Sequence, residues 1–446
     1  MPACVPDPLF FSYLIFFLFL VVLLLYEEEM RSKKTQSLRF VIGATVIGNT
    51  LEWFDFALVG ALAPLFAHLF FPPGSSESYP LFFFALSALA RPIGGFVFGR
   101  LGDRGGRRNA LIKTVMLMTI PVFLLAIMPS YEQIGGAAVA ILAIVCLLQG
   151  FSTGGEFPGS IVFLVESSPS KIRGYVGSFA YFGALLGMLF SVLDLYFVKK
   201  TTGTNFEAWG WRLPFIVGTV LGILAVFFRT ALEETPVFKE EVKTGAILKS
   251  PVFTSFKHTK QLVTGLMIFM LDAVGFNLIF VFSSYYFTTI LGLALKQAFL
   301  INTFTVFVAL ISIPFAGKIS NYLGFYKLSK WAAVAMIVLA LPLYLMMNPQ
   351  QLWTIYFAQA VLALLLSLYL ANLPAIIADI YPAPIRYSSC ALVTNFSVAL
   401  FGGTAPLLAS FFITHTKISC FPALYLIAGA LISLFALNSK IHLQKS

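Results

Sequence analysis

Long apolar blocks separated by short polar connections run through most of the chain. Many of these blocks reach about 18 residues, which as a helix is enough to cross roughly 30 Å of hydrocarbon. A membrane β-barrel would instead show short segments of alternating polarity, and the sequence has no such series. The pattern predicts an all-α membrane protein with twelve spans, near 40–70, 80–100, 109–129, 136–165, 174–198, 211–232, 262–290, 297–318, 328–347, 352–378, 387–414 and 420–438.

A further apolar run, from Leu9 to Tyr26, lies in a hydrophobic extension over residues 1–29. It has little positive charge before it and no small-residue cleavage site after it, so it is not typical of a signal peptide. Two interpretations stay open. The run is an extra span whose N-terminus lies outside, or Met30 is the true start and residues 1–29 are upstream sequence carried into the gene model.

The twelve spans divide into two similar halves. A polar connection at 233–261 separates a six-helix bundle at 30–232 from a second one at 262–446, and we expect this linker to be solvated and to form one surface helix. The pattern acid-x-x-Pro-x-x-x-Arg follows the fourth span, from Glu166 to Arg173, and the tenth, from Asp379 to Arg386. Two matching six-helix halves are typical of transporters that rock about a central site.

Composition and charge agree with this class. The chain is 59% hydrophobic and 11% charged, against roughly 25% charged in soluble domains. By the predicted spans, 23 of the 29 basic residues lie on one side, including Arg229, and only four lie on the other. This asymmetry is the positive-inside rule, so the net charge of +10 sets orientation and does not indicate nucleic-acid binding. The four cysteines are scattered and show no metal-site spacing.

The most specific segment is a short charged hairpin between the second and third spans, Gly99-Arg-Leu-Gly-Asp103-Arg104-Gly-Gly106-Arg107-Arg108. Its glycines allow two helices to turn back almost without a loop. Any short cytoplasmic loop tends to collect arginine, but that tendency does not explain the fixed order of glycine, aspartate and arginine. The hairpin recurs in weaker form from Gly317 to Gly324, where Asn321 stands in the place of the aspartate.

This hairpin matches in full the loop-2/3 signature of the major facilitator superfamily. Over about residues 38–438 the chain resembles the metabolite:proton symporter branch, which contains proline/betaine, α-ketoglutarate, citrate and shikimate transporters. The stretches that carry the resemblance are Gly48-Asn-Thr-Leu-Glu52-Trp53-Phe-Asp55-Phe56, Arg91-Pro-Ile-Gly-Gly95, Leu148-Gln149-Gly-Phe-Ser152-Thr-Gly-Gly155-Glu156, Trp209-Gly-Trp-Arg212-Leu-Pro214, Glu233-Glu234-Thr-Pro-Val-Phe and Ala399-Leu-Phe-Gly-Gly-Thr-Ala-Pro406.

The resemblance implies a major facilitator fold and a charge latch on the cytoplasmic face. In it, Asp103 holds a neighbouring helix N-terminus and a basic partner while the carrier is open outward. Asn321 departs from the pattern and implies a weaker second latch. The chain ends at Ser446, soon after the last span, so the osmotic gating of members with a long C-terminal coiled coil is doubtful here. The implied latch residues are Gly99, Asp103, Arg104, Gly106, Arg107, Arg108, Glu166, Arg173, Asp379 and Arg386.

Of the charged residues inside predicted spans, where charge is costly, we single out four acids and one arginine: Glu52, Asp55, Glu156, Asp272 and Arg91. Pairing with Arg91 could make one acid inert, but one arginine cannot neutralise four. Buried carboxyl groups can change protonation near neutral pH, which a proton-coupled carrier requires. We therefore expect these four acids to be linked to protons or to a substrate ammonium, with Arg91 as counter-ion or carboxylate clamp.

A single well-placed cation favours a zwitterionic substrate such as proline or betaine over a di- or tricarboxylate. Aromatic faces could hold the ammonium by cation–π contact, although most aromatic residues in so aromatic a chain are expected to face lipid or to pack helices. The residues predicted to bind substrate are Asn49, Trp53, Phe56, Arg91, Gln149, Ser152, Tyr181, Phe276 and Tyr286.

We therefore expect a proton symporter of a small polar metabolite, working by alternating access. A di- or tricarboxylate or other organic-acid symporter, and a passive facilitator or channel, stay open as alternatives. No catalytic or nucleotide-binding motif is found, so an enzyme or an ATP-driven pump is not expected. We expect no cofactor beyond the coupling proton, no nucleic-acid partner and a monomer. It should lie in a bacterial cytoplasmic (inner) membrane, with loops 2–3, 4–5 and 6–7 and the C-terminus in the cytoplasm.

Overall fold

The structure of the protein is a computed structural model. It describes residues 36–72, 74 and 79–439, and for 79–85 it describes the backbone alone. The N-terminal apolar run and Met30 lie outside the described residues, so the two interpretations of residues 1–29 stay predictions.

Six long helices form the first half, and they follow the predicted spans closely. The short helix α5 (Tyr131–Ile134) lies in the connection after the third of them. The six are α2 (Leu38–Phe70), α3 (Tyr79–Gly105), α4 (Arg107–Ile127), α6 (Gly136–Ser167), α7 (Arg173–Thr202) and α8 (Leu213–Ala231).

Six further spans form the second half, and three of them are interrupted. Wide π-helical turns break the seventh and eleventh spans, and a two-residue break divides the tenth. The elements are α11 (Thr259–Phe276) with η4 (Asn277–Val281), α12 (Ser283–Tyr285) and η5 (Tyr286–Ile290), α13 (Leu295–Leu323), α14 (Phe325–Met346), α15 (Leu352–Leu370) with α16 (Leu373–Ile380), α17 (Arg386–Ser397) with η7 (Val398–Gly402) and α18 (Ala405–Thr416), and α19 (Phe421–Asn438).

Within the described residues, eleven spans are long and apolar enough to cross a membrane. The one predicted span missing from these eleven is the second along the chain, α3. Its 27 residues have sufficient length but include several charged side chains. The prediction of an all-α protein with twelve spans in two halves is confirmed.

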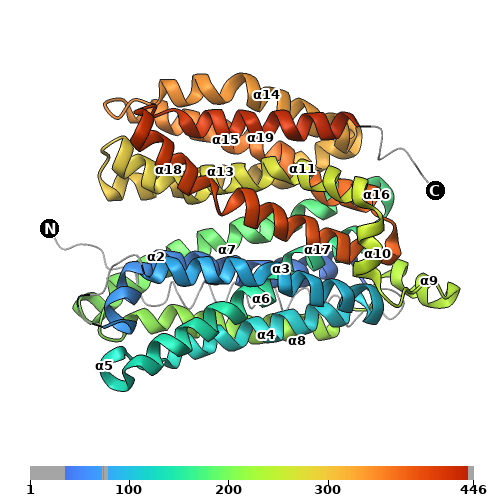
Figure 1. The fold of residues 1–446 in the computed structure, drawn as a ribbon, viewed down its shortest axis with the longest axis horizontal. Coiled ribbons are helices and arrows are strands. Elements are labelled where there is room, and N and C mark those ends of the chain that lie inside the picture. Colours follow the sequence, from blue (N-terminus) through green and yellow to red (C-terminus); the bar gives the residue numbers. More distant parts are fainter. Residues whose placement is uncertain (1–35, 73, 75–78, 440–446) are drawn as a thin grey trace.

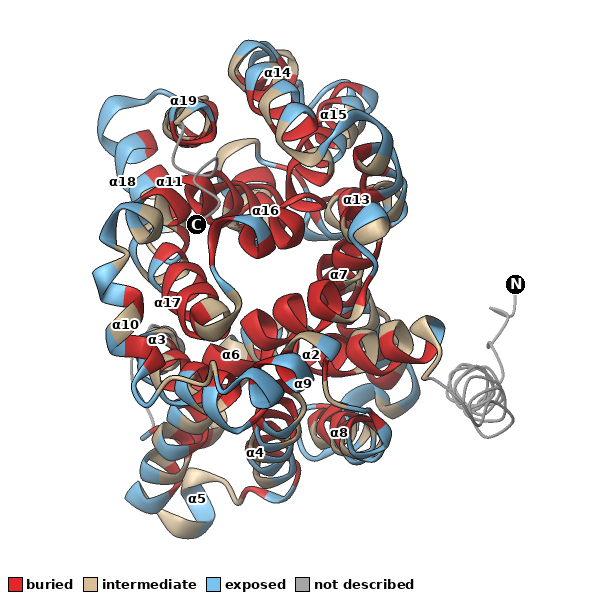
Figure 2. Cartoon of the chain, turned by 90° about the vertical axis from the view of Figure 1, so that its right-hand side faces the viewer, coloured by how far each residue is buried: buried red, intermediate tan, exposed pale blue. Residues whose placement is uncertain are grey.

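The two halves lie side by side as separate bundles. Figure 1 shows α2, α3, α4, α6 and α8 in the lower bundle and α11, α13, α14, α15 and α19 in the upper one. Buried residues gather where the bundles face each other, and exposed residues lie on the outer helices (Figure 2). Many outer side chains are large and apolar, including Leu407 at 71% exposure and Phe435 at 70%. Such a surface fits lipid and not water.

Close helix contacts depend on glycine at a few positions. A Cβ atom at Gly94 of α3 would lie 1.8 Å from the Phe151 carbonyl oxygen of α6. At Gly154 of α6 it would lie 2.1 Å from the Arg91 carbonyl oxygen of α3. Small residues at such crossings let helix backbones touch inside a membrane. The α3–α6 pair therefore holds Arg91 in a fixed position beside the interface between the halves.

The linker differs from the prediction. It forms two helices, α9 (Pro236–Thr244) and α10 (Pro251–Lys257), at the right-hand end of the molecule in Figure 1. Thr235 is fully buried and Glu241 is 5% exposed. The linker thus has two helices and not one, and about half of its residues are exposed as expected, whereas the few buried ones near its start pack against the hairpin.

Candidate substrate-binding site and latch

A small polar cavity of about 50 Å³ lies between the two bundles. Six of the predicted substrate and proton residues line it, and they come from α2, α3, α7 and α11. These six are Trp53, Phe56, Arg91, Tyr181, Asp272 and Phe276.

Arg91 and Asp272 carry the opposite charges of this central cavity. Both side chains are buried. The Tyr181 hydroxyl donates a hydrogen bond of 3.1 Å to Asp272 Oδ2, whereas Arg91 Nε has no hydrogen-bond partner within the described chain. No ion pair within 4.0 Å joins the two in the part of the chain that the structure describes, although each lies within electrostatic reach of the other. A cation and an anion thus face one cavity without neutralising each other directly.

Aromatic rings form one wall of the cavity. The Trp53 ring lies 4.6 Å from that of Phe276 and 5.4 Å from that of Phe56, between centroids. Phe157, which sequence reasoning did not select, lies 5.1 Å from the Tyr181 ring. Several electron-rich faces around one point are the arrangement that binds quaternary ammonium groups.

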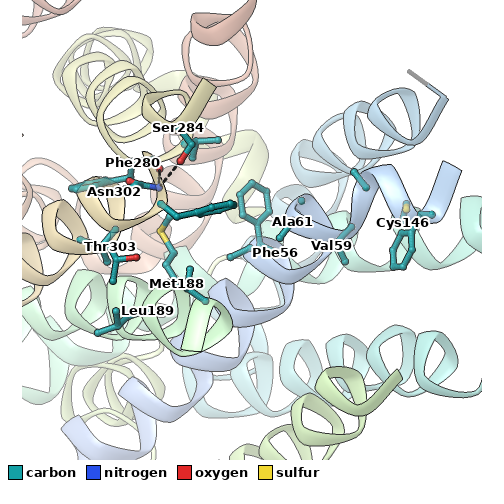
Figure 3. A pocket seen from close by; sticks show the side chains of 18 of the residues that line it. Phe56, Val59, Ala61, Cys146, Met188, Leu189, Phe280, Ser284, Asn302 and Thr303 are labelled. Carbon is teal, nitrogen blue, oxygen red and sulfur yellow. Dashed lines mark hydrogen bonds between the residues drawn. The ribbon is translucent and has the colours of Figure 1, made fainter. Parts of the chain in front are cut away.

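A larger and mostly apolar cavity of about 360 Å³ adjoins the central one. Phe56 and Val281 line both. Its other walls come from the later parts of α2 and α7, the earlier parts of α6 and α13, and the interrupted end of the seventh span, so it lies toward the end of the bundles opposite the hairpin. Figure 3 shows Phe56, Met188 and Asn302 around it. Asn302 Nδ2 donates to Phe280 O at 3.1 Å, which ties α13 to the wide turn η4.

Glu52 and Asp55 lie inside the first bundle, away from the lining of the central cavity. Both are buried, and neither oxygen of Glu52 has a hydrogen-bond partner among the described residues. Gln149 Nε2 donates to Asp55 Oδ2 at 2.5 Å, while Asp55 Oδ1 has no partner within that same part of the chain. Arg91 lies within electrostatic reach of Glu52. Within the described part of the molecule these carboxyl groups are buried without a cation in direct contact, a costly state for a charged group.

Glu156 differs from the prediction, because it has its own cation. Arg229 Nη2 contacts Glu156 Oε1 at 2.5 Å, and both side chains are fully buried. Ser160 also accepts a hydrogen bond from Arg229 at 3.1 Å. A Cβ atom at Gly48 would lie 2.5 Å from Arg229 Nη2, so glycine there makes room for the pair. The placement of Arg229 with the solvated basic residues was wrong. The number of intramembrane acids without a paired cation is therefore one fewer than expected.

Four predicted substrate residues lie outside the cavity lining and serve other contacts. Asn49 Nδ2 donates to Ala180 O at 2.9 Å and ties α2 to α7. Gln149 holds Asp55, and Ser152 Oγ donates to Gln149 O at 2.9 Å within α6. Tyr286 packs against the Tyr344 ring at 5.5 Å. In this conformation they do not reach the central cavity.

Other polar residues at or near the interface were missed. Asn277, Thr394 and Asn395 line the central cavity. A further buried acid within a span, Asp194, has no hydrogen-bond partner for either carboxylate oxygen in the described part of the molecule. Asp194 falls inside the predicted span 174–198, so a charge within an apolar run was a signal that could have found it.

The hairpin closes the interface between the two bundles at the end away from the larger cavity. Asp103, at the end of α3, accepts backbone hydrogen bonds from Tyr387 at 3.0 Å and Ser388 at 2.8 Å, at the start of α17. Negative charge at a helix N-terminus is favourable because the first N–H groups lack partners within the helix. A Cβ atom at Gly102 would lie 2.2 Å from the Tyr387 ring, so glycine permits this close approach.

A buried ion network surrounds this contact. Arg107 Nε lies 3.0 Å from Glu166 Oε2, and Arg107 Nη1 lies 3.1 Å from Glu241 Oε2 in the linker. Arg107 Nη2 also donates to Ala383 O at 2.7 Å, beside the start of α17. Arg386, from the second half, reaches Glu166 Oε1 at 2.8 Å. The network therefore joins both halves and the linker at one end of the molecule.

The linker also caps the third span. Glu234 Oε1 accepts hydrogen bonds from the backbone N–H groups of Arg107 at 3.1 Å and Arg108 at 3.2 Å. Thr235 Oγ1 donates to Glu166 Oε2 at 2.9 Å. Gly106, between the two helices, has φ +101°, a conformation that favours glycine. The Glu-Glu-Thr-Pro stretch is thus part of the latch.

Three residues of the implied latch stand apart from it. Arg173, which was expected beside Glu166, forms no ion pair in the described chain. Arg386 pairs with Glu166 instead. Asp379 accepts a hydrogen bond from the Tyr326 hydroxyl at 3.0 Å and lies at the surface. Arg104 is exposed. The two acid-and-arginine repeats therefore contribute unequally, because Glu166 of one pairs with Arg386 of the other.

Comparisons with known proteins agree with this architecture. The family model for sugar (and other) transporters matches residues 41–246. The glycine betaine/proline/ectoine/pipecolic acid transporter OusA of Dickeya dadantii (strain 3937) is 32% identical over 413 residues, covering 89% of this chain and 82% of the relative. The proline/betaine transporter of Escherichia coli (strain K12) gives the same identity and coverage. The solved proton:xylose symporter XylE superposes with a TM-score of 0.73 at 17% identity, covering 90% of this chain and 94% of that one.

The fold is therefore that of the major facilitator superfamily, and the protein is a multi-pass secondary transporter and not an enzyme. Within that superfamily, the chain belongs to the proline/betaine transporter-like family. The resemblance inferred from the sequence motifs is confirmed.

Proposed function

We propose that the protein imports a zwitterionic compatible solute of the proline or betaine type, coupled to protons, by alternating access. The observation that carries this proposal is the pair Arg91 and Asp272, which face one aromatic-walled cavity without an ion pair between them in the described chain. A carboxylate of the substrate would bind Arg91, and its ammonium would lie between Asp272 and the rings of Trp53 and Phe276.

The charge of the cavity argues against a di- or tricarboxylate. Among the described residues that line the central cavity, Arg91 is the one cation, and Asp272 offsets it. A second substrate carboxylate would have no cation to meet and would lie near Asp272. Both relatives named above are proline/betaine transporters by name, which favours the same substrate class here.

Closure at one end and cavities toward the other support an outward-facing state. The hairpin would be the cytoplasmic end, because the predicted excess of basic residues lies there, and the protein would lie in a bacterial inner membrane as a monomer. The larger cavity would then be the entry path. The central cavity has room for only a few water molecules at its present volume, so a solute must displace side chains, Phe56 among them, as it enters.

Proton coupling would rest on Glu52 and Asp55. They are buried, they lack a cation in direct contact within the described chain, and Glu52 lies within electrostatic reach of Arg91. Protonation of Glu52 would leave Arg91 free to clamp a substrate carboxylate, and release of the substrate would let Arg91 stabilise the ionised Glu52. Because Glu156 is already paired with Arg229, we assign that pair to packing and not to coupling.

Uptake into proteoliposomes tests the proposal. With an inward proton gradient, labelled betaine and proline should accumulate, a protonophore should abolish accumulation, and dicarboxylates should not compete. Asp272→Asn should abolish betaine uptake. Glu207→Gln should not, because Glu207 is exposed and does not line the central cavity. Glu52→Gln should retain solute exchange but lose gradient-driven accumulation.

The alternatives give different results in the same assay. Preferential uptake of a dicarboxylate would identify an organic-acid symporter. Betaine equilibration that ignores the proton gradient would identify a passive facilitator, and the role proposed for Glu52 would then be wrong.

A further inference from the structure

A second groove lies at the hairpin end, where the two halves meet on the side away from Asp103. It encloses about 560 Å³ between the start of α7, preceded by the short turn η1 (Ser170–Ile172), and the end of α13. Its lining comes from both halves: Lys171, Ile172, Tyr175, Lys318, Asn321 and Tyr322.

This groove occupies the position that the second latch would have. At the first latch, Asp103 accepts two backbone hydrogen bonds of 3.0 and 2.8 Å from the start of α17. At the second, Asn321 Oδ1 accepts one bond of 3.4 Å from the backbone N–H of Tyr175, at the start of α7. The replacement of aspartate by asparagine removes the negative charge, so the described residues that line the groove include no carboxylate.

The groove instead carries unbalanced positive charge. Lys171 and Lys318 face it from opposite halves, and both are exposed. Arg173 lies two residues after Lys171 and outside the groove lining; its buried Nε has no hydrogen-bond partner in the described structure, and Glu166 and Asp379 lie within electrostatic reach of it. The acids nearest in the chain are engaged elsewhere, since Glu166 pairs with Arg107 and Arg386 and Asp379 accepts from Tyr326.

We propose that this groove binds a phosphate-bearing anion, which supplies the negative charge that Asn321 lacks. Lysine side chains bind phosphate as point charges, and the hydroxyl groups of Tyr175 and Tyr322 can donate to its oxygens. The groove lies at the end of the spans, where phospholipid headgroups meet the protein, and Tyr322 is 80% exposed there. The anion is either a phospholipid headgroup or a soluble phosphate.

The proposal is separate from the transport substrate, because the groove and the central cavity share no lining residue. By charge alone, an anion here would bind both halves together and stabilise the closed arrangement of the hairpin end. Its binding therefore links α7 of the first bundle to α13 of the second.

Binding to the purified, delipidated full-length protein tests this inference. Native mass spectrometry and thermal shift would follow titration with inorganic phosphate, with phosphatidylglycerol and with phosphatidylcholine. We expect saturable stabilisation by phosphatidylglycerol, by phosphate or by both, and none specific to phosphatidylcholine. Response to phosphate identifies a soluble anion as sufficient, and response to phosphatidylglycerol alone identifies a headgroup.

Variants connect the signal to the groove. The double substitution Lys171→Ala and Lys318→Ala should weaken binding roughly 30-fold, from the loss of two cations near an anionic headgroup. Lys327→Ala is the matched control, because Lys327 lies over the Trp331 ring at 4.8 Å and does not line the groove. Equal affinity in the double variant and the control would overturn the proposal.

Asn321→Asp provides a second test that keeps both lysines. It restores the carboxylate of the other hairpin, so it should weaken anion binding and stabilise the protein without any anion. An unchanged anion affinity in Asn321→Asp overturns the proposal even if the double variant fails to fold.

Discussion

Asp103→Asn should open the hairpin end of the molecule without unfolding it. The carboxylate accepts two backbone N–H groups at 3.0 and 2.8 Å and lies 3.6 Å from Arg107. Asparagine keeps one acceptor oxygen but turns an NH₂ group toward the second N–H and removes the charge. Hydrogen bonds to charged groups contribute about 1.5–3 kcal/mol each. We therefore expect the closed state to lose about 2–3 kcal/mol, which shifts the closed-to-open ratio by roughly 30- to 150-fold.

Distance measurements across the interface would detect this shift. Spin labels at Asn109 of α4 and Lys327 of α14 place one exposed probe on each half near the hairpin end, in a background without the four native cysteines. Asp103→Asn should move the distance distribution toward longer values and reduce uptake. Arg104→Ala is the control, because Arg104 is exposed in the same hairpin. A wild-type distribution together with normal uptake in Asp103→Asn would refute the reasoning.

Three further predictions follow from the buried contacts. Arg229→Met should destabilise the protein by about 3–5 kcal/mol because it leaves Glu156 buried and unpaired, and adding Glu156→Gln should restore most of the loss in thermal unfolding. Gly102→Ala should prevent closure in the same distance assay, whereas Gly105→Ala should not, because its Cβ atom would meet only one side-chain atom, at 3.4 Å. Burial raises the pKa of Glu241 from 4.5 to about 7. The docked linker therefore holds this proton more tightly than the undocked one, so docking should weaken as pH rises from about 5 to 7 and then level off. Protection of α9 from hydrogen exchange, taken relative to the intrinsic exchange rate at each pH, should be stronger at pH 6 than at pH 8, and Glu241→Gln should remove the difference in protection.

The helical framework was predictable because span length and apolarity are local properties of the sequence. The end of α2 at Phe70 and that of α19 at Asn438 match the predicted boundaries. The hairpin was predictable for a related reason, since a fixed order of glycine, aspartate and arginine is found within ten residues. The grouping of Trp53, Arg91 and Asp272 around one cavity followed from the cost of intramembrane charge and from the family motifs.

Pairings between distant segments were not predictable from the same signals. Arg229 lies two residues from the end of α8, where hydropathy cannot distinguish a side chain that reaches water from one that turns inward to Glu156. Glu241 lies in a polar linker whose composition indicates solvent, but its partner Arg107 is 134 residues away. Arg173 and Arg386 occupy equivalent repeat positions, and only the packing of α17 against α3 and α6 determines that Arg386 reaches Glu166.

The two halves are thus joined unequally at the hairpin end. On the α3–α17 side, a carboxylate and a buried ion network hold the closed state. On the α7–α13 side, one hydrogen bond to the Asn321 side chain lies beside a basic groove. If the groove binds its anion only when closed, linkage requires a reciprocal effect. The anion must raise the affinity for a solute entering from the opposite end by the same factor by which that solute raises the affinity for the anion. The lipid or phosphate at one end of the carrier would then set how readily the other end takes up its substrate.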